Sequence, residues 1–266
     1  MRFPSIEKTA VIGVIGAGTM GAGIAQLAAV HGHPVLLLDA AEGAAAAIAR
    51  IAKMLAALVE KGRISEADCC AAIARLQPVD KLDAMAGTAL VIEAIVENLQ
   101  IKQQLMQSLE QVVKPDTILA TNTSSISVTA IANGMQHPER LAGMHFFNPV
   151  PLMKLVEVIA GTETRTDVLE SLAALVERWG KTVVHAASTP GFIVNRIARP
   201  YYAEALQLLQ EQAGTPAQLD RAMRSIGFRL GPCELMDLIG HDVNYAVTAS
   251  VFEAKEALIY SPKAFP

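Results

Sequence analysis

The sequence predicts an α/β fold with a doubly wound, mostly parallel sheet, followed by a smaller all-helical domain. Three observations support this prediction. A glycine-rich turn follows the first apolar run, short apolar runs then alternate with helical segments, and only helical segments follow Thr189-Pro190-Gly191. We therefore expect a first domain over residues 1–189 and a helical domain over residues 190–266.

The first apolar run, Val11 to Ile15, leads into Gly16-Ala17-Gly18-Thr19-Met20-Gly21 and then into a helix expected over residues 20–30. In such a G-x-G-x-x-G turn the first glycine permits a tight turn, the second lets the backbone approach phosphates, and the third lets helix and strand pack closely. The helix N-terminus adds free N–H groups and a positive dipole end. The pattern alone can be a chance glycine-rich loop, so its surroundings must support a dinucleotide site.

The surroundings agree with that interpretation. Pro34 to Leu38 is a short apolar run typical of a buried parallel strand, and Asp39 ends it. An acidic residue about 20 residues past the glycines recognises a ribose 2′-hydroxyl. Because a 2′-phosphate would be repelled and no arginine follows directly, Asp39 favours NAD. Asp39 is also a candidate N-cap for a helix over residues 40–61, and both roles can hold together.

The remaining elements continue the alternation of strands and helices. Residues 40–74 read as an alanine-rich helical pair that Gly62 interrupts. Further strands are expected at 89–94, 117–121, 141–145, 155–159 and 182–185, with helices at 101–113 and 167–179. In the second domain, helices are expected at 193–212, 216–226 and 242–258.

Composition excludes several classes of function. The net charge of −4 leaves no basic excess for nucleic acid or an anionic membrane. No run of about 18 uncharged apolar residues is present, so a membrane span is not expected. The three cysteines, of which Cys69 and Cys70 are adjacent, form neither a disulfide framework nor a zinc-ligand pattern. We expect a protein of the reducing cytoplasm without a bound metal.

Polar side chains follow the apolar runs at the places where an open α/β sheet binds its ligands. They form three groups, which are Glu93, Glu97, Asn98 and Lys102, then Asn122 to Ser125, then His145 to Pro151.

Glu157 lies inside the apolar run 155–159, where a buried carboxylate needs a partner. We expect that partner to be His145, which would then be a general base oriented by a carboxylate. A hydrogen-bonded core histidine is the alternative. Ser124 and Asn195 could hold a reacting oxygen, although each alone is more often a turn residue or a helix cap.

Together these residues resemble the L-3-hydroxyacyl-CoA dehydrogenases of fatty-acid β-oxidation and related pathways, nearly from end to end of the chain. The resemblance rests on six segments, which are Gly16-x-Gly18-x-Met20-Gly21, Glu93-Ala94-Ile95-Val96-Glu97-Asn98, Asn122-Thr123-Ser124-Ser125, His145-Phe146-Phe147-Asn148-Pro149, Met153-Lys154-Leu155-Val156-Glu157-Val158 and Thr189-Pro190-Gly191-Phe192-Ile193-Val194-Asn195-Arg196.

The resemblance implies an NAD-binding domain, a helical domain that forms a homodimer, and an active site in the cleft between the two. It implies that His145 is the catalytic base, that Glu157 is its partner, and that Ser124 and Asn195 contact the substrate oxygen. Residues matched to cofactor positions are Thr19, Met20 and Asn122, together with Glu97, Lys102 and Asn148 near the nicotinamide half.

Two departures from the family pattern concern the coenzyme A contacts and the C-terminus. A serine and a lysine of the family's helical arm fall on Leu55 and near Gly62, so Lys53, Lys61 and Arg63 are only candidates for coenzyme A contacts. A further helix and a glycine-rich basic stretch are not found before Pro266, so we expect the helical domain to be incomplete. Residues 198–202 are similar to the 3-hydroxyadipyl-CoA dehydrogenases of phenylacetate breakdown.

The resulting hypothesis is NAD-dependent oxidation of a 3-hydroxyacyl-CoA to a 3-ketoacyl-CoA, with His145 as the base. One alternative is an NAD-binding protein of the same fold without turnover. Another is a β-hydroxyacid dehydrogenase acting on a free acid, which would use a lysine in the helix after the boundary. The segment 193–212 contains no lysine.

Overall fold

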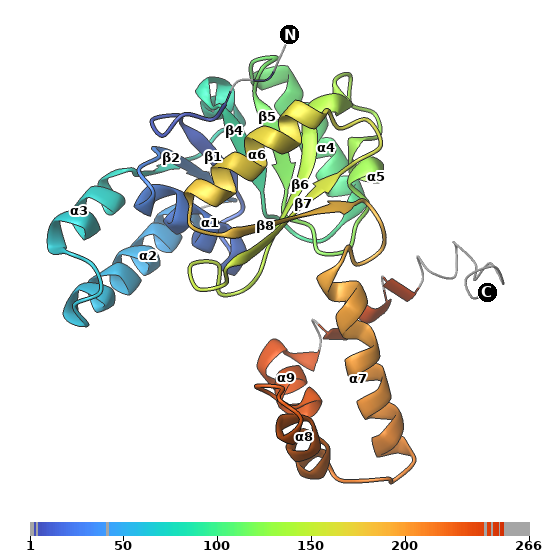
Figure 1. The fold of residues 1–266 in the computed structure, drawn as a ribbon. Helices are drawn as coiled ribbons and strands as arrows, with labels where there is room; N and C mark the ends of the chain where they lie inside the picture. Colours follow the sequence, from blue (N-terminus) through green and yellow to red (C-terminus); the bar gives the residue numbers. More distant parts are fainter. Residues whose placement is uncertain are drawn as a thin grey trace. The chain divides into compact units, whose positions relative to one another are not determined.

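The computed structural model describes residue 3 and residues 5–40, 43–241, 244, 245, 247–249, 251 and 252. These residues belong to two compact units, one up to Ser188 and one from Thr189 onward. A sheet flanked by helices forms the first unit, and the helices α7, α8 and α9 lie in the second (Figure 1).

The sheet has eight strands in the order β3-β2-β1-β4-β5-β6-β7-β8. All neighbouring strands pair in parallel except β6 and β7, which are antiparallel. The predicted doubly wound, mostly parallel sheet is therefore confirmed. The strands are β1 (Ile12–Ile15), β2 (Val35–Leu38), β3 (Leu76–Val79), β4 (Leu90–Glu93), β5 (Ile118–Thr121), β6 (Leu141–Phe146), β7 (Leu155–Ala160) and β8 (Thr182–Ala187).

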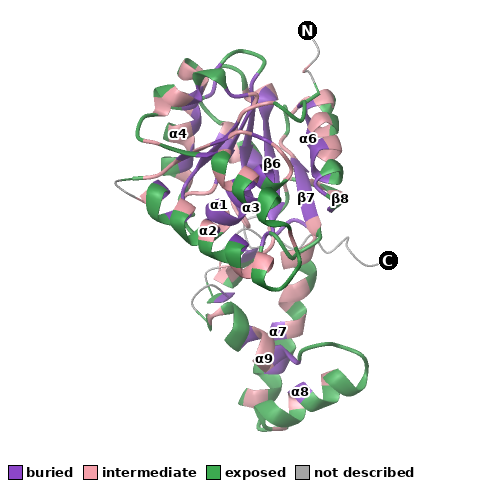
Figure 2. Ribbon diagram, turned by 90° about the vertical axis from the view of Figure 1, so that its left-hand side faces the viewer, coloured by how far each residue is buried: buried purple, intermediate pink, exposed green. Residues whose placement is uncertain are grey.

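Helices cover both faces of the sheet because successive side chains of a strand point to opposite faces. The apolar residues of α1 (Thr19–Val30) and α6 (Thr166–Arg178) join one core with Val14 of β1 and Val158 of β7. The other face carries α4 (Leu99–Val112) and α5 (Val128–Ala132). Figure 2 shows α4 and α6 on opposite sides of the buried strands.

The remaining helices of the first unit are α2 (Gly43–Glu60) and α3 (Glu66–Ala74), with short 3-10 turns at Leu82–Gly87 and Pro138–Arg140. The interruption at Gly62 is confirmed, because Gly62 has φ +64 and ends the first helix of the pair. In the second unit the helices are α7 (Val194–Gln210), α8 (Pro216–Ser225) and α9 (Pro232–Ile239). No helix among the described residues is long and apolar enough to cross a membrane.

One strand and two α-helices were not predicted. The strand β3 carries Pro78 and has two exposed residues, so it lacks the apolar run that marks a buried strand, and it lies at the edge of the sheet, where proline is tolerated. The helices α5 and α9 are only five and eight residues long, too short to show a helical period clearly. The helix expected over 242–258 falls largely outside the described residues.

Candidate active site

The candidate site lies at the carboxyl ends of the central strands. The strand β1 pairs with β2 on one side and with β4 on the other, so the strand order reverses at β1. Open α/β sheets bind ligands outside the carboxyl ends of the strands at this reversal. The glycine-rich turn follows β1, and the polar groups singled out in the sequence follow β4, β5 and β6.

The three glycines of the turn differ in how much space their surroundings leave for a side chain. Gly16 has φ +100, and a Cβ there would lie 2.4 Å from the Ala94 carbonyl oxygen. A Cβ on Gly21 would lie 1.8 Å from the Gly16 carbonyl oxygen. A Cβ on Gly18 would meet no atom within 4 Å, so the protein itself does not require glycine at that position. The open space at Gly18 is what the approach of a ligand's phosphates requires.

The turn leads directly into α1, whose first turn contains no acidic residue. A helix N-terminus favours an anion through its N–H groups and its dipole. Thr19 is exposed at the start of this helix, whereas Met20 is half-buried and packs against the core. The open space at Gly18 and the absence of acid beside it fit the pyrophosphate of a dinucleotide.

Asp39 follows β2 and is tied to the glycine-rich turn. Its carboxylate accepts N–H bonds from Ala17 at 2.7 Å and from Ala40 at 2.6 Å. Arg50 of α2 donates to the carbonyl oxygen of the same Ala17 at 3.0 Å. Both sides of the Ala17 residue are therefore held by charged side chains. The arginine was not predicted, because it lies eleven residues beyond Asp39 in an alanine-rich segment.

His145 and Glu157 are direct partners across the antiparallel pair β6 and β7. The His145 Nδ1 atom lies 2.6 Å from Glu157 Oε2, and the two side chains are 7% and 0% exposed. The expected contact between these residues is confirmed. The ring of Phe147 lies 4.5 Å from that of His145. A carboxylate held against one ring nitrogen fixes the orientation of the imidazole.

The other predicted residues lie in three places. Asn122 follows β5 and accepts the Phe146 N–H at 2.9 Å, which joins the end of β5 to the end of β6. Asn148 is exposed in the connection from β6 to β7, before a cis peptide bond to Pro149. Asn195 lies in the other unit, in the first turn of α7, where its carbonyl accepts from Arg199.

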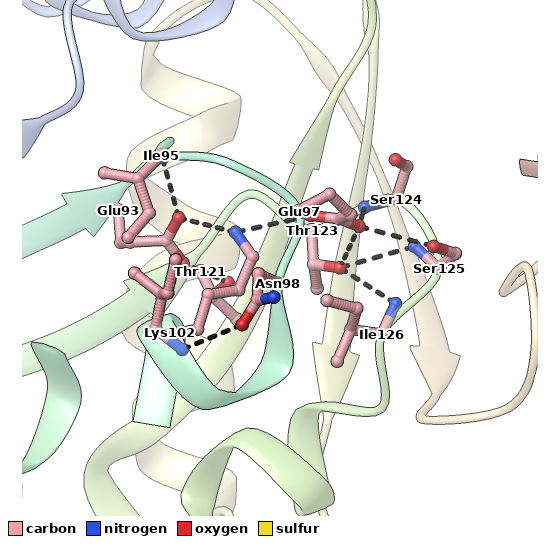
Figure 3. A network of polar contacts seen from close by, with 11 residues as sticks. Glu93, Ile95, Glu97, Asn98, Lys102, Thr121, Thr123, Ser124, Ser125 and Ile126 are labelled. Atoms are coloured by element: carbon pink, nitrogen blue, oxygen red, sulfur yellow. Dashed lines mark hydrogen bonds and ion pairs between the residues drawn. The ribbon is translucent and has the colours of Figure 1, made fainter. Parts of the chain in front are cut away.

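A network of charged groups joins the ends of β4 and β5 (Figure 3). The Lys102 ammonium lies 2.6 Å from Glu93 Oε1 and 3.3 Å from Glu97 Oε2, and Lys102 is only 1% exposed. Glu97 Oε1 accepts from the Thr123 hydroxyl at 2.6 Å and from the Ser124 N–H at 3.0 Å. The network thus connects Lys102 to the loop that carries Ser124.

Two opposing influences act on the pKa of Glu97. Burial alone would raise this pKa, but the Lys102 ammonium and the hydrogen bonds from Thr123 and Ser124 outweigh burial and lower it below its ordinary value. Glu97 is consequently held as a carboxylate at the edge of the site.

No group of three or more possible metal-binding side chains occurs in the part of the chain that the structure describes. The arrangement offers an anion site at a helix N-terminus, a carboxylate for a ribose and a histidine held by a buried glutamate. These are the parts that an alcohol dehydrogenase using a nicotinamide dinucleotide requires.

Two protein-family models match the chain. The model of the 3-hydroxyacyl-CoA dehydrogenase NAD binding domain matches residues 11–189, and that of the C-terminal domain matches residues 191–265. The chain belongs to the 3-hydroxyacyl-CoA dehydrogenase family. The first matched domain binds NAD in this family, which agrees with the open glycine-rich turn and with Asp39.

Known members of the 3-hydroxyacyl-CoA dehydrogenase family are similar over most of this chain. The 3-hydroxyadipyl-CoA dehydrogenase of Escherichia coli K12 is 53% identical over 91% of this chain, which spans 52% of that protein. A probable 3-hydroxybutyryl-CoA dehydrogenase of Deinococcus radiodurans is 42% identical, and the match covers 88% of this chain and 85% of the Deinococcus protein. The crystal structure of (S)-3-hydroxybutyryl-CoA dehydrogenase from Ralstonia eutropha matches with a TM-score of 0.89 and 37% identity, covering 92% of this chain and 88% of that one.

The structure also bears on the helical arm of 3-hydroxyacyl-CoA dehydrogenases. Leu55, on which the resemblance places the family's arm serine, is 1% exposed and packs in the core. Leu55 is therefore not available to a ligand. The candidate cations Lys53, Lys61 and Arg63 are all exposed.

Proposed function

We propose that this chain catalyses the NAD-dependent oxidation of the 3-hydroxyl group of a 3-hydroxyacyl-CoA to a 3-ketoacyl-CoA. The observation that carries the proposal is the 2.6 Å contact between the buried side chains of His145 on β6 and Glu157 on β7. Membership of the family supports the choice of substrate class.

In this mechanism His145 accepts the proton of the substrate hydroxyl as hydride leaves C3. NAD, when bound, supplies the hydride acceptor. Glu157 holds the imidazole in one orientation and stabilises the imidazolium that forms. Ser124 and Asn195 are proposed to hydrogen-bond the reacting oxygen. In the reverse direction the protonated His145 returns its proton to the ketone oxygen.

The test compares two buried histidines. His33 is 2% exposed and its Nδ1 atom lies 3.1 Å from the Ala10 carbonyl oxygen, so it is a hydrogen-bonded core histidine. We expect His145→Gln to lower NADH-dependent reduction of acetoacetyl-CoA by about 10²- to 10⁴-fold while NADH binding stays unchanged. His33→Gln should keep its turnover per folded molecule. Retained turnover in His145→Gln would refute the proposed base.

The cofactor positions are proposed in the same way. We propose that Gly16, Gly18, Thr19, Met20 and Gly21 surround the pyrophosphate. Asp39 is proposed to bind the adenosine ribose. The residues proposed to lie near the nicotinamide half are Glu97, Lys102 and Asn148, and Asn122 is proposed as a further cofactor contact.

We further propose a dicarboxylic acyl-CoA as the preferred substrate, as in phenylacetate breakdown. The similarity to the E. coli protein named 3-hydroxyadipyl-CoA dehydrogenase supports this choice. The test is kcat/KM for matched short linear and dicarboxylic 3-ketoacyl-CoA thioesters, and a preference for the linear compounds would refute it. Lys53, Lys61 and Arg63 remain candidates for coenzyme A contacts.

We propose that the second unit forms a homodimer. An apolar cavity of about 860 Å³ lies among α7, α8 and α9. Its lining includes Ile197, which is 71% exposed, and Phe228, which stacks on Tyr201 at 5.0 Å between ring centres. Apolar side chains that are exposed and gathered in one place are typical of an interface. Sedimentation should show a dimer that Ile197→Glu dissociates, and a monomeric parent chain would refute the proposal.

We also propose a cytoplasmic location. The support is that Cys69, Cys70 and Cys233 are all free thiols. Labelling of the thiols in intact cells and after lysis tests this location, and their recovery as disulfides would contradict it.

A protein that binds NAD without turnover is one alternative. It predicts NADH binding together with no oxidation of NADH by acetoacetyl-CoA. A free-acid dehydrogenase predicts turnover of 3-hydroxy acids that lack coenzyme A, but α7 contains no lysine to serve as its acid–base group.

A further inference from the structure

Glu93 is a fully buried carboxylate at the centre of the candidate site. It is the last residue of β4, and its backbone lies in register with Ile15 of β1 and Thr121 of β5. The side chain is 0% exposed. An isolated carboxylate in such a place would be costly, so its partners decide what it does.

Both carboxylate oxygens of Glu93 have partners. Oε1 accepts from the Lys102 ammonium at 2.6 Å and from the Ile95 N–H at 2.8 Å, and Oε2 accepts from the Thr121 hydroxyl at 2.7 Å (Figure 3). The three donors belong to α4, to the turn after β4 and to β5. One side chain therefore ties together three segments at the carboxyl edge of the sheet.

The contact between Glu93 and Lys102 connects Glu93 to the loop that carries Ser124. Lys102 lies closer to Glu93 than to Glu97, at 2.6 Å against 3.3 Å, so the buried glutamate sets the position of the ammonium. Glu97 in turn accepts the Ser124 N–H. The two carboxylates and one ammonium leave one net negative charge, on the side of the half-exposed Glu97.

The hydrogen bond between Glu93 and Ile95 connects Glu93 to the glycine-rich turn. The Ile95 N–H that Glu93 fixes belongs to the turn after β4. A Cβ on Gly16 would lie 2.4 Å from the Ala94 carbonyl oxygen and 3.1 Å from the Ile95 nitrogen. The turn held by Glu93 therefore packs directly against the proposed pyrophosphate loop.

We propose that Glu93 is a positioning residue of the cofactor site, holding Lys102 and the turn at Ile95 so that the Ser124 loop and the glycine-rich turn keep the geometry that NAD requires. An apolar pair would hold α4 against the sheet equally well, because a buried ion pair is seldom more stabilising than its hydrophobic replacement. An apolar pair would not fix the ammonium against Glu97. The proposal rests on the NAD site proposed above.

The first experiment compares Glu93→Gln with Glu110→Gln. Glu110 is a matched control, since its side chain is 3% exposed, lies 3.7 Å from the buried Arg140 and accepts the Gln136 and His137 N–H groups, in the last turn of α4. We expect Glu93→Gln to raise the Kd for NADH by about tenfold, the effect of losing one hydrogen bond to a charged group. Glu110→Gln should leave the Kd within twofold of the parent. Equal shifts in both variants would overturn the proposal.

The second experiment asks whether Glu93 acts through Lys102. In the background of Lys102→Met, adding Glu93→Gln should weaken NADH binding by much less than tenfold and should raise stability, because the double variant leaves no unpaired buried charge. If the two substitutions instead raise the Kd by independent factors that multiply, the proposal that Glu93 acts through Lys102 is overturned.

A neutral pair of variants keeps the test valid if the charge variants do not fold. Thr121→Val removes the hydroxyl that donates to Glu93. Thr117→Val removes a buried hydroxyl that donates to the Thr88 carbonyl at 2.7 Å, just before the start of the same strand. We expect a Kd for NADH raised severalfold in the first variant only, and no difference between the two would overturn the proposal. Failure of the parent chain to bind NADH would instead refute the cofactor site itself.

Discussion

Glu157→Gln is the sharpest perturbation of the proposed reaction. Glutamine has nearly the same shape and keeps an oxygen that can accept from His145 Nδ1, but it removes the charge. The contact is 2.6 Å long and Glu157 is 0% exposed, so solvent does not replace the lost interaction. A hydrogen bond to a charged group contributes about 1.5–3 kcal/mol. This interaction strengthens as His145 becomes imidazolium, so kcat should fall by about 10- to 100-fold.

The assay is NADH oxidation by acetoacetyl-CoA at saturating substrate, with the Kd for NADH measured on the same preparation. Trp179 is the only tryptophan of the chain, and its energy transfer to bound NADH reports binding. We expect the Kd to stay within twofold, because Glu157 lies on β7, which is separated from β1 and its glycine-rich turn by three other strands. A kcat within twofold of the parent would refute Glu157 as the partner of the base. A Kd shift as large as the kcat loss would show that the effect is structural.

Three further predictions use other parts of the site. Gly18→Ala should weaken NADH binding and leave stability unchanged, since the added Cβ would meet no protein atom. Gly21→Ala should lower the free energy of unfolding, measured in urea, by about 3 kcal/mol, because its Cβ would overlap the Gly16 carbonyl oxygen. Equal stability of the two variants would contradict this prediction. Asp39→Asn should narrow the preference for NAD over NADP by about tenfold in kcat/KM, because the repelling carboxylate is gone, and an unchanged ratio would count against it. The pKa of Glu97 is lowered from 4.5, so its carboxylate contributes stability above that value and loses it as the pH falls further. The stability gap between the parent and Glu97→Gln should therefore shrink from pH 6 to pH 3, and a constant gap would contradict the cause assigned to the shift.

The sequence was sufficient to predict those parts of the site that depend on short segments. The glycine-rich turn follows an apolar run directly, so its place after β1 could be predicted from spacing alone. The pairing of His145 with Glu157 could be predicted because a carboxylate inside an apolar run must have a partner. The direction of β7 could not be predicted, since an apolar run carries no information on whether its neighbour is parallel.

The parts of the site that escaped prediction depend on contacts between distant segments. Arg50 reaches Ala17 across 33 residues of sequence, and an arginine on an alanine-rich helix normally points to solvent. In the sequence Glu93 resembles any other polar residue at a strand end, because its donors Lys102 and Thr121 lie farther along the chain. The edge strand β3 also depends on a distant contact. Its sequence contains Pro78 and does not predict a strand, but its pairing with β2 makes it one.

The orientation of the proposed base depends on the register of β6 and β7. His145 and Glu157 face each other because the register of the antiparallel pair places them directly opposite, and a slip of one residue would move Glu157 to the opposite face of the sheet. The connection between these strands is held by Lys181, whose ammonium donates to the carbonyl oxygens of Val150 and Met153 at 2.7 Å each. Lys181 is buried, and that burial lowers its pKa, so the cation is kept there at a cost in free energy. A lysine that precedes β8 therefore helps to hold the connection between the two strands that carry the proposed base and its partner.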